Sequence, residues 1–470
     1  MSERHFDMAV IGAGSGGLTA AAAAAQFGCK VVLFERGDMG GECLNSGCVP
    51  SKALLAVAKQ AHAMRTGADF GIRPVEPEVD FAAVRAYVQR AIAAIAPHDG
   101  QERFEKLGVT VVRSAARFRD PRTLEAGGER FTARRVVIST GSSPALPPVP
   151  GLEDVPYLTN ETLFQNAELP RHLLVLGAGP IGLEMAQAHR RLGSAVTVVE
   201  ARLPLAQADP ELSAVLLEKL AAEGIEIMTG RAAVRAVRDG GGIRLELEGG
   251  GILAGSHLLV AAGRRPNLEG LGLEAAGIAF TARGITVDRG LRTTNRRVYA
   301  VGDVAGGRFT HEAAYQAGLV IRNALFGLPV TARSDMPQVT YTDPELAQAG
   351  MTEAEARARH GGAVKVLRFA FSGNDRALTE GRTEGLVKVV TGRRGRILGA
   401  GIVGPGAGEL IQPWVLALER GLGISAMATP VLPYPTRGEA GRRAAVNYFQ
   451  DFASNSLVRR VIWAVSKLRP

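Results

Sequence analysis

The chain has 470 residues, of which 46% are hydrophobic and only 5% aromatic, with 58 glycines and a formal net charge of +9 at pH 7. This size allows about two to four domains, and the apolar share excludes a disordered chain. Arginine occurs in singles and pairs, so we expect the charge to attract small anionic ligands and not nucleic acid. Three cysteines exclude a secreted disulfide scaffold, and without a visible leader the sequence predicts a cytoplasmic protein.

The first predicted element is a strand that runs into a glycine turn and an alanine-rich helix, in "DMAVIGAGSGGLTAAAAAAQFGCKVVLFER". The same order recurs in "HLLVLGAGPIGLEMAQAHRRLGSAVTVVEAR". Gly12 and Glu35 are 23 positions apart, as are Gly177 and Glu200. Repetition of the whole strand–turn–helix–strand unit predicts two dinucleotide-binding folds, although a tight turn without a ligand is the alternative for each.

Glycines in these turns would let the backbone and the helix N-terminus approach a pyrophosphate, and the acid would accept from a ribose hydroxyl. The candidate cofactor-binding residues are Gly12, Gly14, Gly17 and Glu35 in the first unit, and Gly177, Gly179, Gly182 and Glu200 in the second. A carboxylate at Glu200 would repel a 2′-phosphate, which favours NAD over NADP, although Arg202 would soften this preference. Two such folds in one chain indicate electron transfer between FAD and NAD(P)H.

Between the two units lies "GGECLNSGCVPSK", in which four residues separate Cys43 from Cys48, a spacing that permits a disulfide across about one helical turn. A bridge over so short a loop is a poor structural staple but a good redox couple. Too few ligands surround the pair for a metal site, so none is predicted, and a buried idle pair is the alternative. Lys52 would stabilise negative charge on a reduced flavin, with Glu184 as its candidate partner.

Further candidates follow predicted strands later in the chain. Gly141 lies in "RVVISTGSSPALPPVPG", whose prolines indicate a crossover between domains. Gly302 and Asp303 lie in "RVYAVGDVAG", where the acid would bind a cofactor hydroxyl or simply cap a turn. From about Gln338, alternating strands and helices predict an α+β domain.

These motifs resemble class I pyridine nucleotide–disulfide oxidoreductases over nearly the whole chain, because "GAGPIGLE", "AAGRRPN", "AVGDVAG" and "VTYTDPELAQAG" also match in order. The resemblance implies an α/β fold with two Rossmann-like domains and a C-terminal α+β dimerisation domain. The implied divisions are FAD domain 1–150, NAD(P) domain 151–270, second FAD or central part 271–337, and dimerisation domain 338–470. It also implies a homodimer in which the C-terminal segment of one chain completes the active site of the other.

Carried over by position, the resemblance makes Cys43 the thiol that meets substrate and Cys48 the thiol against the flavin. Lys52 and Glu184 match an ion pair beside the isoalloxazine, and Asp303 matches a flavin-binding acid. Members that act on thiol substrates carry a His where this chain has Tyr434, with a Glu at the position of Glu439. A phenol, with a pKa of about 10, is a poor base at neutral pH.

Tyr434 and "NDRALTEGRTEGLVKVV" are similar to mercuric reductases, but no cysteine follows Cys48 to supply their terminal pair. The sequence therefore predicts a reductase for a disulfide, a metal ion or another soft electrophile. The alternatives are a dihydrolipoamide dehydrogenase with an altered base and a flavin-bearing sensor. The tail "SLVRRVIWAVSKLRP" predicts a basic amphipathic helix, for which packing on its own dimer is favoured over contact with a membrane surface. Its apolar residues are Leu457, Val458, Val461, Ile462 and Val465, and its basic residues are Arg459, Arg460, Lys467 and Arg469.

Overall fold

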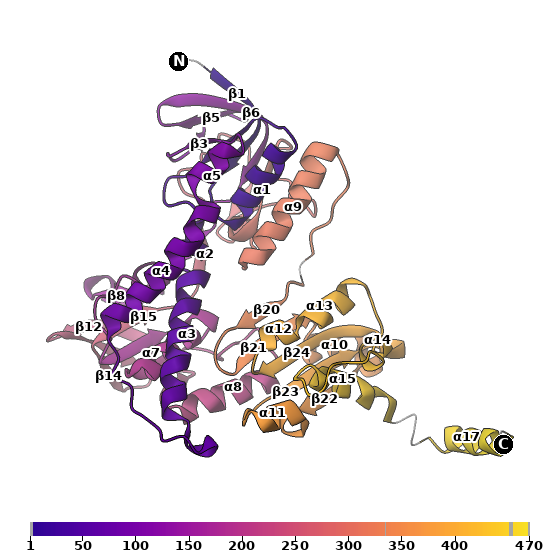
Figure 1. The fold of residues 1–470 in the computed structure, drawn as a ribbon. Coiled ribbons are helices and arrows are strands. Elements are labelled where there is room, and N and C mark those ends of the chain that lie inside the picture. The colour runs from indigo at the N-terminus through magenta and orange to yellow at the C-terminus, as the bar shows by residue number, and fades with distance from the viewer. Residues whose placement is uncertain (1–2, 334, 451–454, 469–470) are drawn as a thin grey trace. The chain divides into compact units, whose positions relative to one another are not determined.

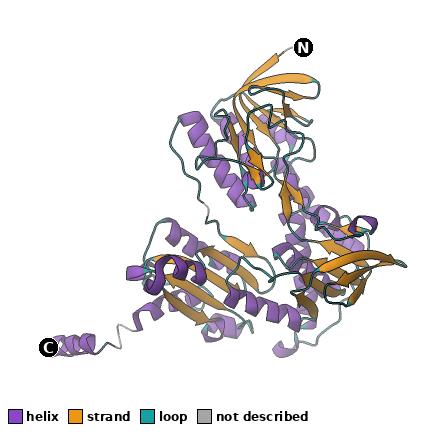
Figure 2. Cartoon of the chain, turned by 180° about the vertical axis from the view of Figure 1, so that it is seen from behind, coloured by secondary structure: helices purple, strands orange, loops and turns teal. Residues whose placement is uncertain are grey.

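The computed structural model describes residues 3–333, 335–450 and 455–468, so Arg469 lies outside the described residues. The chain divides into two compact units, coloured along the chain in Figure 1. The first comprises 1–64, 76–201 and 230–334, and the second comprises 65–75, 202–229 and 335–470. Helices and strands are mixed throughout (Figure 2), which confirms the predicted α/β class.

The first unit contains a largely parallel sheet. Its strands are β1 Glu3–Ile11, β2 Val31–Phe34, β3 Thr110–Val112, β4 Arg117–Phe118, β5 Thr123–Ala126, β6 Glu129–Ile138 and β19 Val298–Ala300. The order is β3-β2-β1-β6-β5-β4, with β19 also paired to β6. Ile11 pairs with both Phe34 and Ile138, and Ile138 pairs with Ala300. The carboxyl ends of four parallel strands therefore meet at one edge, where ligands bind in open α/β sheets.

Helices α1 Ser15–Gln26, α5 Gln101–Lys106 and α9 Thr310–Phe326 pack on this sheet. Three further helices of the chain are α2 Gly41–Asn45, α3 Cys48–Arg65 and α4 Phe81–Asp99. Helix α1 packs against α9, and Ala20, Ala21 and Ala24 are completely buried in α1. Alanine combines high helix propensity with a small side chain, so the run of alanines forms a helix that a neighbour approaches closely.

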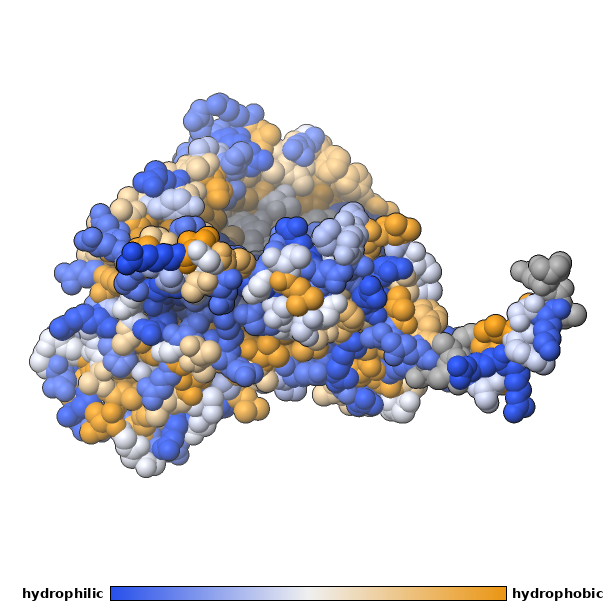
Figure 3. Space-filling model, turned by 60° about the horizontal axis from the view of Figure 1, so that its bottom comes forward, coloured by the Kyte–Doolittle hydropathy of each residue, from blue (hydrophilic) through white to orange (hydrophobic). Residues whose placement is uncertain are grey.

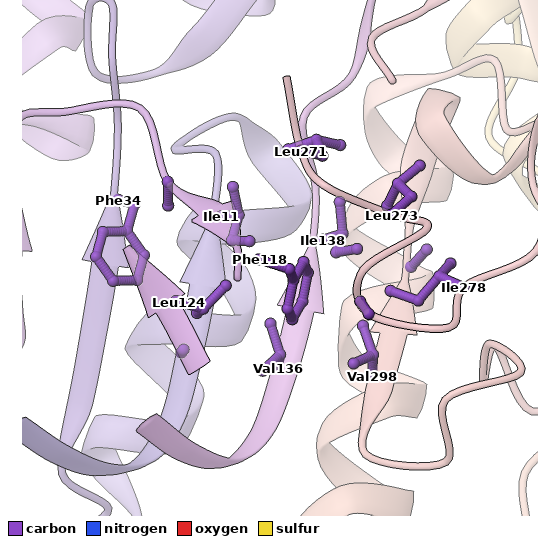
Figure 4. Close-up of a cluster of buried hydrophobic side chains, with 14 of the residues drawn as sticks. Ile11, Phe34, Phe118, Leu124, Val136, Ile138, Leu271, Leu273, Ile278 and Val298 are labelled. Carbon is purple, nitrogen blue, oxygen red and sulfur yellow. The ribbon is translucent and has the colours of Figure 1, made fainter. Parts of the chain in front are cut away.

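One face of the sheet is closed by a cluster of apolar side chains (Figure 4). Phe34 and Phe131 meet edge to face with ring centroids 5.0 Å apart. Leu271, Leu273 and Ile278 come from a much later segment and cover the same face. This packing fixes β2, β6 and β19 against one another and so holds the turns at their carboxyl ends in place.

A second parallel sheet in the first unit repeats the strand–turn–helix–strand arrangement. Its elements include β8 Tyr157–Leu158, β9 His172–Leu176, α7 Pro180–Leu192, β10 Ala195–Glu200 and β15 His257–Val260. Strand β9 lies between β10 and β15, and β15 also pairs with β8. Both predicted strand–turn–helix–strand repeats are therefore present, and both lie in the first compact unit. Smaller elements complete the unit: α6 Asn160–Leu163, β7 Ser142–Pro144, β12 Ala233–Asp239, β13 Gly242–Leu247, β14 Ile252–Gly255, β16 Arg264–Pro266, β17 Phe280–Thr281 and β18 Gly284–Ile285.

The second unit is built on an antiparallel sheet of order β20-β21-β24-β23-β22. These strands are β20 Gln338–Thr340, β21 Glu345–Gly350, β22 Lys365–Ala370, β23 Leu386–Thr391 and β24 Ile397–Gly404. Its other elements are α8 Pro210–Ala222, β11 Ile225–Thr229, α10 Glu353–His360, α11 Asp375–Thr379, α12 Ala407–Leu410, α13 Gln412–Glu419, α14 Ser425–Ala428, α15 Glu439–Val446 and α17 Ser456–Leu468. Trp414 of α13 is buried in the core between sheet and helices. The α+β pattern expected after Gln338 is confirmed.

Across the described residues, no helix is both long and apolar enough to cross a membrane.

Candidate active site

The first glycine turn joins β1 to α1 at the sheet's carboxyl edge. Gly12 has φ +101°, and a Cβ there would lie 2.4 Å from the Ser139 carbonyl oxygen. A Cβ on Gly17 would lie 1.9 Å from the carbonyl oxygen of Gly12, whereas nothing lies within 4 Å of a Cβ placed on Gly14. Gly12 and Gly17 thus let the backbone pack, and Gly14 leaves space before the N-terminus of α1, which no side chain caps. This arrangement fits a pyrophosphate.

Glu35, the acid that follows the first glycine turn, lies directly after β2, and its side chain turns back toward the glycines. Its Oε2 accepts from the Ala13 amide at 2.7 Å and its Oε1 from the Gly37 amide at 2.7 Å. The carboxylate is therefore held beside the turn, at the place where a ribose hydroxyl would need an acceptor.

The second glycine turn, between β9 and α7, repeats this geometry. A Cβ on Gly177 would lie 2.5 Å from the Ala261 carbonyl oxygen, and one on Gly182 would lie 2.0 Å from the Gly177 carbonyl oxygen. Gly179 faces open space, and Glu200 accepts from the Ala178 amide at 2.8 Å. The chain therefore holds two cradles of the same design, which fit two dinucleotides.

The two cysteines come from different helices. Cys43 lies in α2 and Cys48 begins α3, with Ser46 and Gly47 between the two helices, so the expectation that one helical turn separates the cysteines is wrong. A disulfide between them stays a prediction. A Cβ on Gly47 would lie 2.9 Å from the Glu42 carbonyl oxygen, so glycine permits the sharp break between the helices. Both cysteines are free thiols in this structure, and each shifts the pKa of the other.

The surroundings make these two thiols unequal. A hydrogen bond from Cys43 lowers the pKa of Cys48 to about 6, and the Thr310 hydroxyl and the charge of Lys52 act in the same direction. The Thr310 Oγ1 atom lies 3.6 Å from the Cys48 Sγ, at the start of α9. The same thiol–thiol bond, together with burial, raises the pKa of Cys43. The surroundings thus favour the thiolate form at Cys48 and the protonated thiol at Cys43.

Lys52 and Glu184 are brought together as the sequence predicted. The Lys52 Nζ lies 2.8 Å from the Glu184 Oε2, and the Glu184 side chain is only 5% exposed. Helix α3 carries Lys52 four residues beyond Cys48, so the cation lies on the same face as the thiolate. The buried Glu184 carboxylate therefore holds the positively charged Lys52 ammonium in one position.

Asp303 belongs to a polar cluster that contains residues missed by the sequence reasoning. The Ser142 hydroxyl donates to Asp303, and the Arg264 Nε lies 3.7 Å from the Asp303 carboxylate. Arg264 also donates to Glu42, whose pKa burial raises to about 7. Arg264 is part of the motif "AAGRRPN" and Glu42 is part of "GGECLNSGCVPSK". The spacing of these motifs in the sequence does not predict that the two side chains meet.

The remaining glycine candidates lie in the same strand-end loops. Gly141 has φ +66° and no atom within 4 Å of an added Cβ, so space is open beside it. Gly302 has φ +72° and its amide donates to Gln316 Oε1 at 2.8 Å. Both follow strands whose carboxyl ends meet at the first glycine turn.

Tyr434 and Glu439 lie in the second unit, whereas the cysteines lie in the first. The Tyr434 side chain is 70% exposed, and its hydroxyl donates to the Asp375 Oδ2 at 2.9 Å. That carboxylate raises the pKa of Tyr434 above its ordinary value, because a nearby negative charge opposes ionisation of the phenol. Glu439 begins α15, with its Oε1 4.0 Å from the Arg443 Nε.

The thiolate form of Cys48 is expected to disappear as the pH falls through about 6, because its pKa lies below the usual 9.0. In FAD-loaded Cys43→Ser protein, where the serine hydroxyl still donates, the visible absorbance of a thiolate beside the flavin would follow this midpoint. Thr310→Val removes one donor and should move the midpoint up by about one pH unit. A midpoint close to 9 in the parent variant would contradict the geometry.

Two dinucleotide cradles and a dithiol at the carboxyl edge of a parallel sheet define a class of redox enzyme that works with two nucleotide cofactors. Residues 6–318 match the family model described as pyridine nucleotide-disulphide oxidoreductase, and residues 336–445 match its dimerisation domain. The chain belongs to this family. It is therefore an enzyme, a flavoprotein oxidoreductase that uses FAD and a pyridine nucleotide.

Curated relatives match almost the whole chain. A dihydrolipoyl dehydrogenase of Thermus scotoductus is 40% identical over 94% of this chain and 97% of its own length. A mercuric reductase of Streptomyces lividans is 38% identical over 96% of this chain and 98% of its own. Among solved structures, the HOCl-induced flavoprotein disulfide reductase RclA of Escherichia coli has a TM-score of 0.84 at 27% identity, covering 93% of this chain and 99% of its own.

Proposed function

We propose that the protein is an NAD(P)H-dependent reductase in which Cys43 and Cys48 form the redox couple and a soft, thiol-binding metal ion accepts the electrons. Bound FAD would take up hydride from the nicotinamide and pass an electron pair to the cysteines. Gly12, Gly14 and Glu35 would hold that cofactor, and Lys52 would place positive charge beside it. Cys43, whose pKa is raised by its contact with Cys48 and by burial, would meet the acceptor.

The observation that carries this proposal is the state of Tyr434. A disulfide or dithiol substrate exchanges a proton with the interchange thiol, and such exchange needs a base that titrates near neutral pH. The Tyr434 hydroxyl already donates a hydrogen bond to Asp375, and that carboxylate raises the pKa of the phenol further. A soft metal ion displaces the thiol proton of Cys43 when it binds the sulfur, so its reduction does not need a base at this position.

The chemistry of the acceptor follows from the ligands on offer. Soft thiolates favour Cu(I) and other soft ions. One NAD(P)H would reduce two Cu(II) ions to two Cu(I) ions and release NAD(P)⁺ and one proton. The proposal of a metal ion as the acceptor is supported by the likeness to mercuric reductases and to RclA. One solved structure of RclA is a Cu(II) complex.

A panel of acceptors tests the proposal. The FAD-loaded protein would be assayed anaerobically with Cu(II), Hg(II), glutathione disulfide and lipoamide, with Cu(I) captured by a specific chelator. Metal reduction should exceed disulfide reduction and survive Tyr434→Phe. Tyr434→His should raise disulfide turnover by about tenfold or more, since it restores a base. Fast disulfide turnover by the unaltered enzyme, with little metal reduction, would reject the metal ion as acceptor.

The second candidate is a dihydrolipoamide dehydrogenase with an altered base. The 40% identity to the Thermus scotoductus enzyme over nearly the whole length favours it. Steady-state oxidation of dihydrolipoamide by NAD separates the two candidates. Rates near background would exclude this role, and rates that depend on Tyr434 would support it.

We infer a preference for NADH because Glu200 ends β10 beside the second glycine turn, where it would repel a 2′-phosphate. Glu200→Ala is expected to raise kcat/KM for NADPH about tenfold relative to NADH. The measurement is kcat/KM for both nucleotides, with the exposed Glu248→Ala as a matched control. Equal ratios in Glu200→Ala and the control would refute the assignment.

We further infer a homodimer, which is supported by the match of residues 336–445 to the dimerisation domain. The division into a FAD domain, an NAD(P) domain, a central part and a dimerisation domain at 150, 270 and 337 stays a prediction. Sedimentation velocity at several concentrations would measure the oligomeric state.

A further inference from the structure

The tail helix α17, Ser456–Leu468, presents an exposed apolar stripe. Leu457, Val461 and Val465 repeat every four residues, with Val458 and Ile462 beside them, so all five lie on one side of a helix with about 3.6 residues per turn. Leu457, Val461, Ile462 and Val465 are 68%, 56%, 61% and 46% exposed. A contiguous apolar stripe that is exposed to water is unusual on a protein surface and indicates a site that binds a protein or a membrane.

The opposite face of the helix is basic. Arg459, Arg460 and Lys467 lie there, and the sequence has no Asp or Glu from 455 to 468. Trp463 lies between these cations, with the Lys467 Nζ 4.0 Å from the centre of its ring. Figure 3 shows blue hydrophilic and orange apolar side chains together on this short helix.

The length and the charge of α17 indicate what kind of surface its apolar stripe binds. The helix has 13 residues, too few for the span of about 20 that a bilayer core needs. A second copy of the chain carries a net charge of +9, which repels a basic helix, whereas an anionic lipid surface attracts it. The tail also lies beyond residues 336–445, which match the dimerisation domain. We propose that α17 docks the enzyme on an anionic membrane surface.

In this arrangement the helix lies flat in the interface. The apolar stripe enters the boundary between headgroups and acyl chains, while the basic side chains stay at headgroup level. Binding then depends on two separable contributions, apolar burial and charge. It does not depend on which electron acceptor the enzyme uses, so it stands apart from the function proposed above.

Vesicle co-sedimentation of the full-length, FAD-loaded protein tests the proposal. Vesicles of phosphatidylcholine alone would be compared with vesicles of phosphatidylcholine and phosphatidylglycerol in equal parts. The protein should pellet with the anionic vesicles and be released by high salt. Val461→Ser with Val465→Ser should weaken binding at least about tenfold without changing charge. Arg459→Gln with Arg460→Gln should weaken it by about tenfold or more.

Trp463→Ser is the matched control, because it removes a larger apolar side chain from the basic face and leaves the stripe intact. It should bind within about twofold of the unaltered protein, since that face stays toward water. Cofactor-dependent turnover in solution should be the same in all variants, which shows that each one folds. Failure of the unaltered protein to pellet, or equal pelleting of all variants, would overturn membrane docking. A smaller oligomer in the Val461→Ser, Val465→Ser variant with undiminished vesicle binding would assign the stripe to a second copy instead.

Discussion

Cys48→Ser protein is expected to lose NAD(P)H-dependent turnover by about a thousandfold or more while keeping its fold and its flavin. Cys48 is the first residue of α3, and its neighbours Thr310 and Lys52 favour the thiolate over the thiol. A serine hydroxyl keeps the hydrogen bond to Thr310 but cannot form the bond to Cys43 or hold a negative charge at neutral pH. The loss should therefore fall on the chemistry and leave stability nearly unchanged.

The two cysteines should differ in their spectra although both are needed for turnover. Cys43→Ser protein should be equally inactive, yet it should keep the absorbance of a thiolate beside the flavin, which Cys48→Ser should lack. Cys29→Ser is the control, because burial raises the pKa of the Cys29 thiol. Among the hydrogen bonds of the described residues, none joins Cys29 to a residue of the candidate site. An active Cys48→Ser enzyme, or an undiminished thiolate absorbance, would refute the assignment.

The glycine turns could be predicted because their chemistry is local. Gly12 and Gly177 need a positive φ, and the following glycine must leave open space, so a short spacing rule finds both. The acids Glu35 and Glu200 follow from the same rule, since the next parallel strand ends at the same edge. Repetition of the unit then indicated the class of enzyme.

Long-range partners could not be predicted in this way. Thr310 is 262 positions from Cys48, and it reaches the thiol only because α9 packs on α1 and β19 pairs with β6. Arg264 reaches Glu42 through the pairing of β16 with β7. Tyr434 was identified as a departure from the family, but its partner Asp375 depends on how α11 and the loop before α15 pack. Tertiary packing sets these contacts, and a single sequence does not reveal it.

A buried charge network in the second unit leads to the other large expected effect. Lys388 of β23 has a side chain that is only 5% exposed, and its Nζ lies 2.8 Å from Asp209, 2.8 Å from Glu211 and 2.9 Å from Glu353. Arg368 completes the network with two bonds to Glu211 at 2.7 and 2.8 Å. The network joins α8, α10 and the sheet. Arg368 and Lys388 hold the pKa of Glu211 at about 2, so its contribution fades as the pH falls below the ordinary 4.5.

Lys388→Met is expected to destabilise the second unit by about 3–5 kcal/mol, because Asp209, 4% exposed, loses its cation inside the protein. That loss corresponds to a fall of about 6–20 °C in the unfolding midpoint. Trp414, which is buried in the same unit, reports it by fluorescence in a Trp463→Phe background. Lys219→Met, which breaks the partly exposed pair with Glu384, should shift stability by no more than about 1 kcal/mol.

The double variant Lys388→Met with Asp209→Asn separates the cost of a stranded charge from the value of the pair itself. If the stranded carboxylate causes most of the loss, removing its charge should recover a large part of the stability, so the two changes should be far from additive. Additive losses would mean that Lys388 acts mainly through the packing of its methylene chain. A buried lysine beside three carboxylates favours the first outcome, because Asp209 also caps α8 through the Glu211 amide at 3.0 Å and cannot move away without fraying that helix.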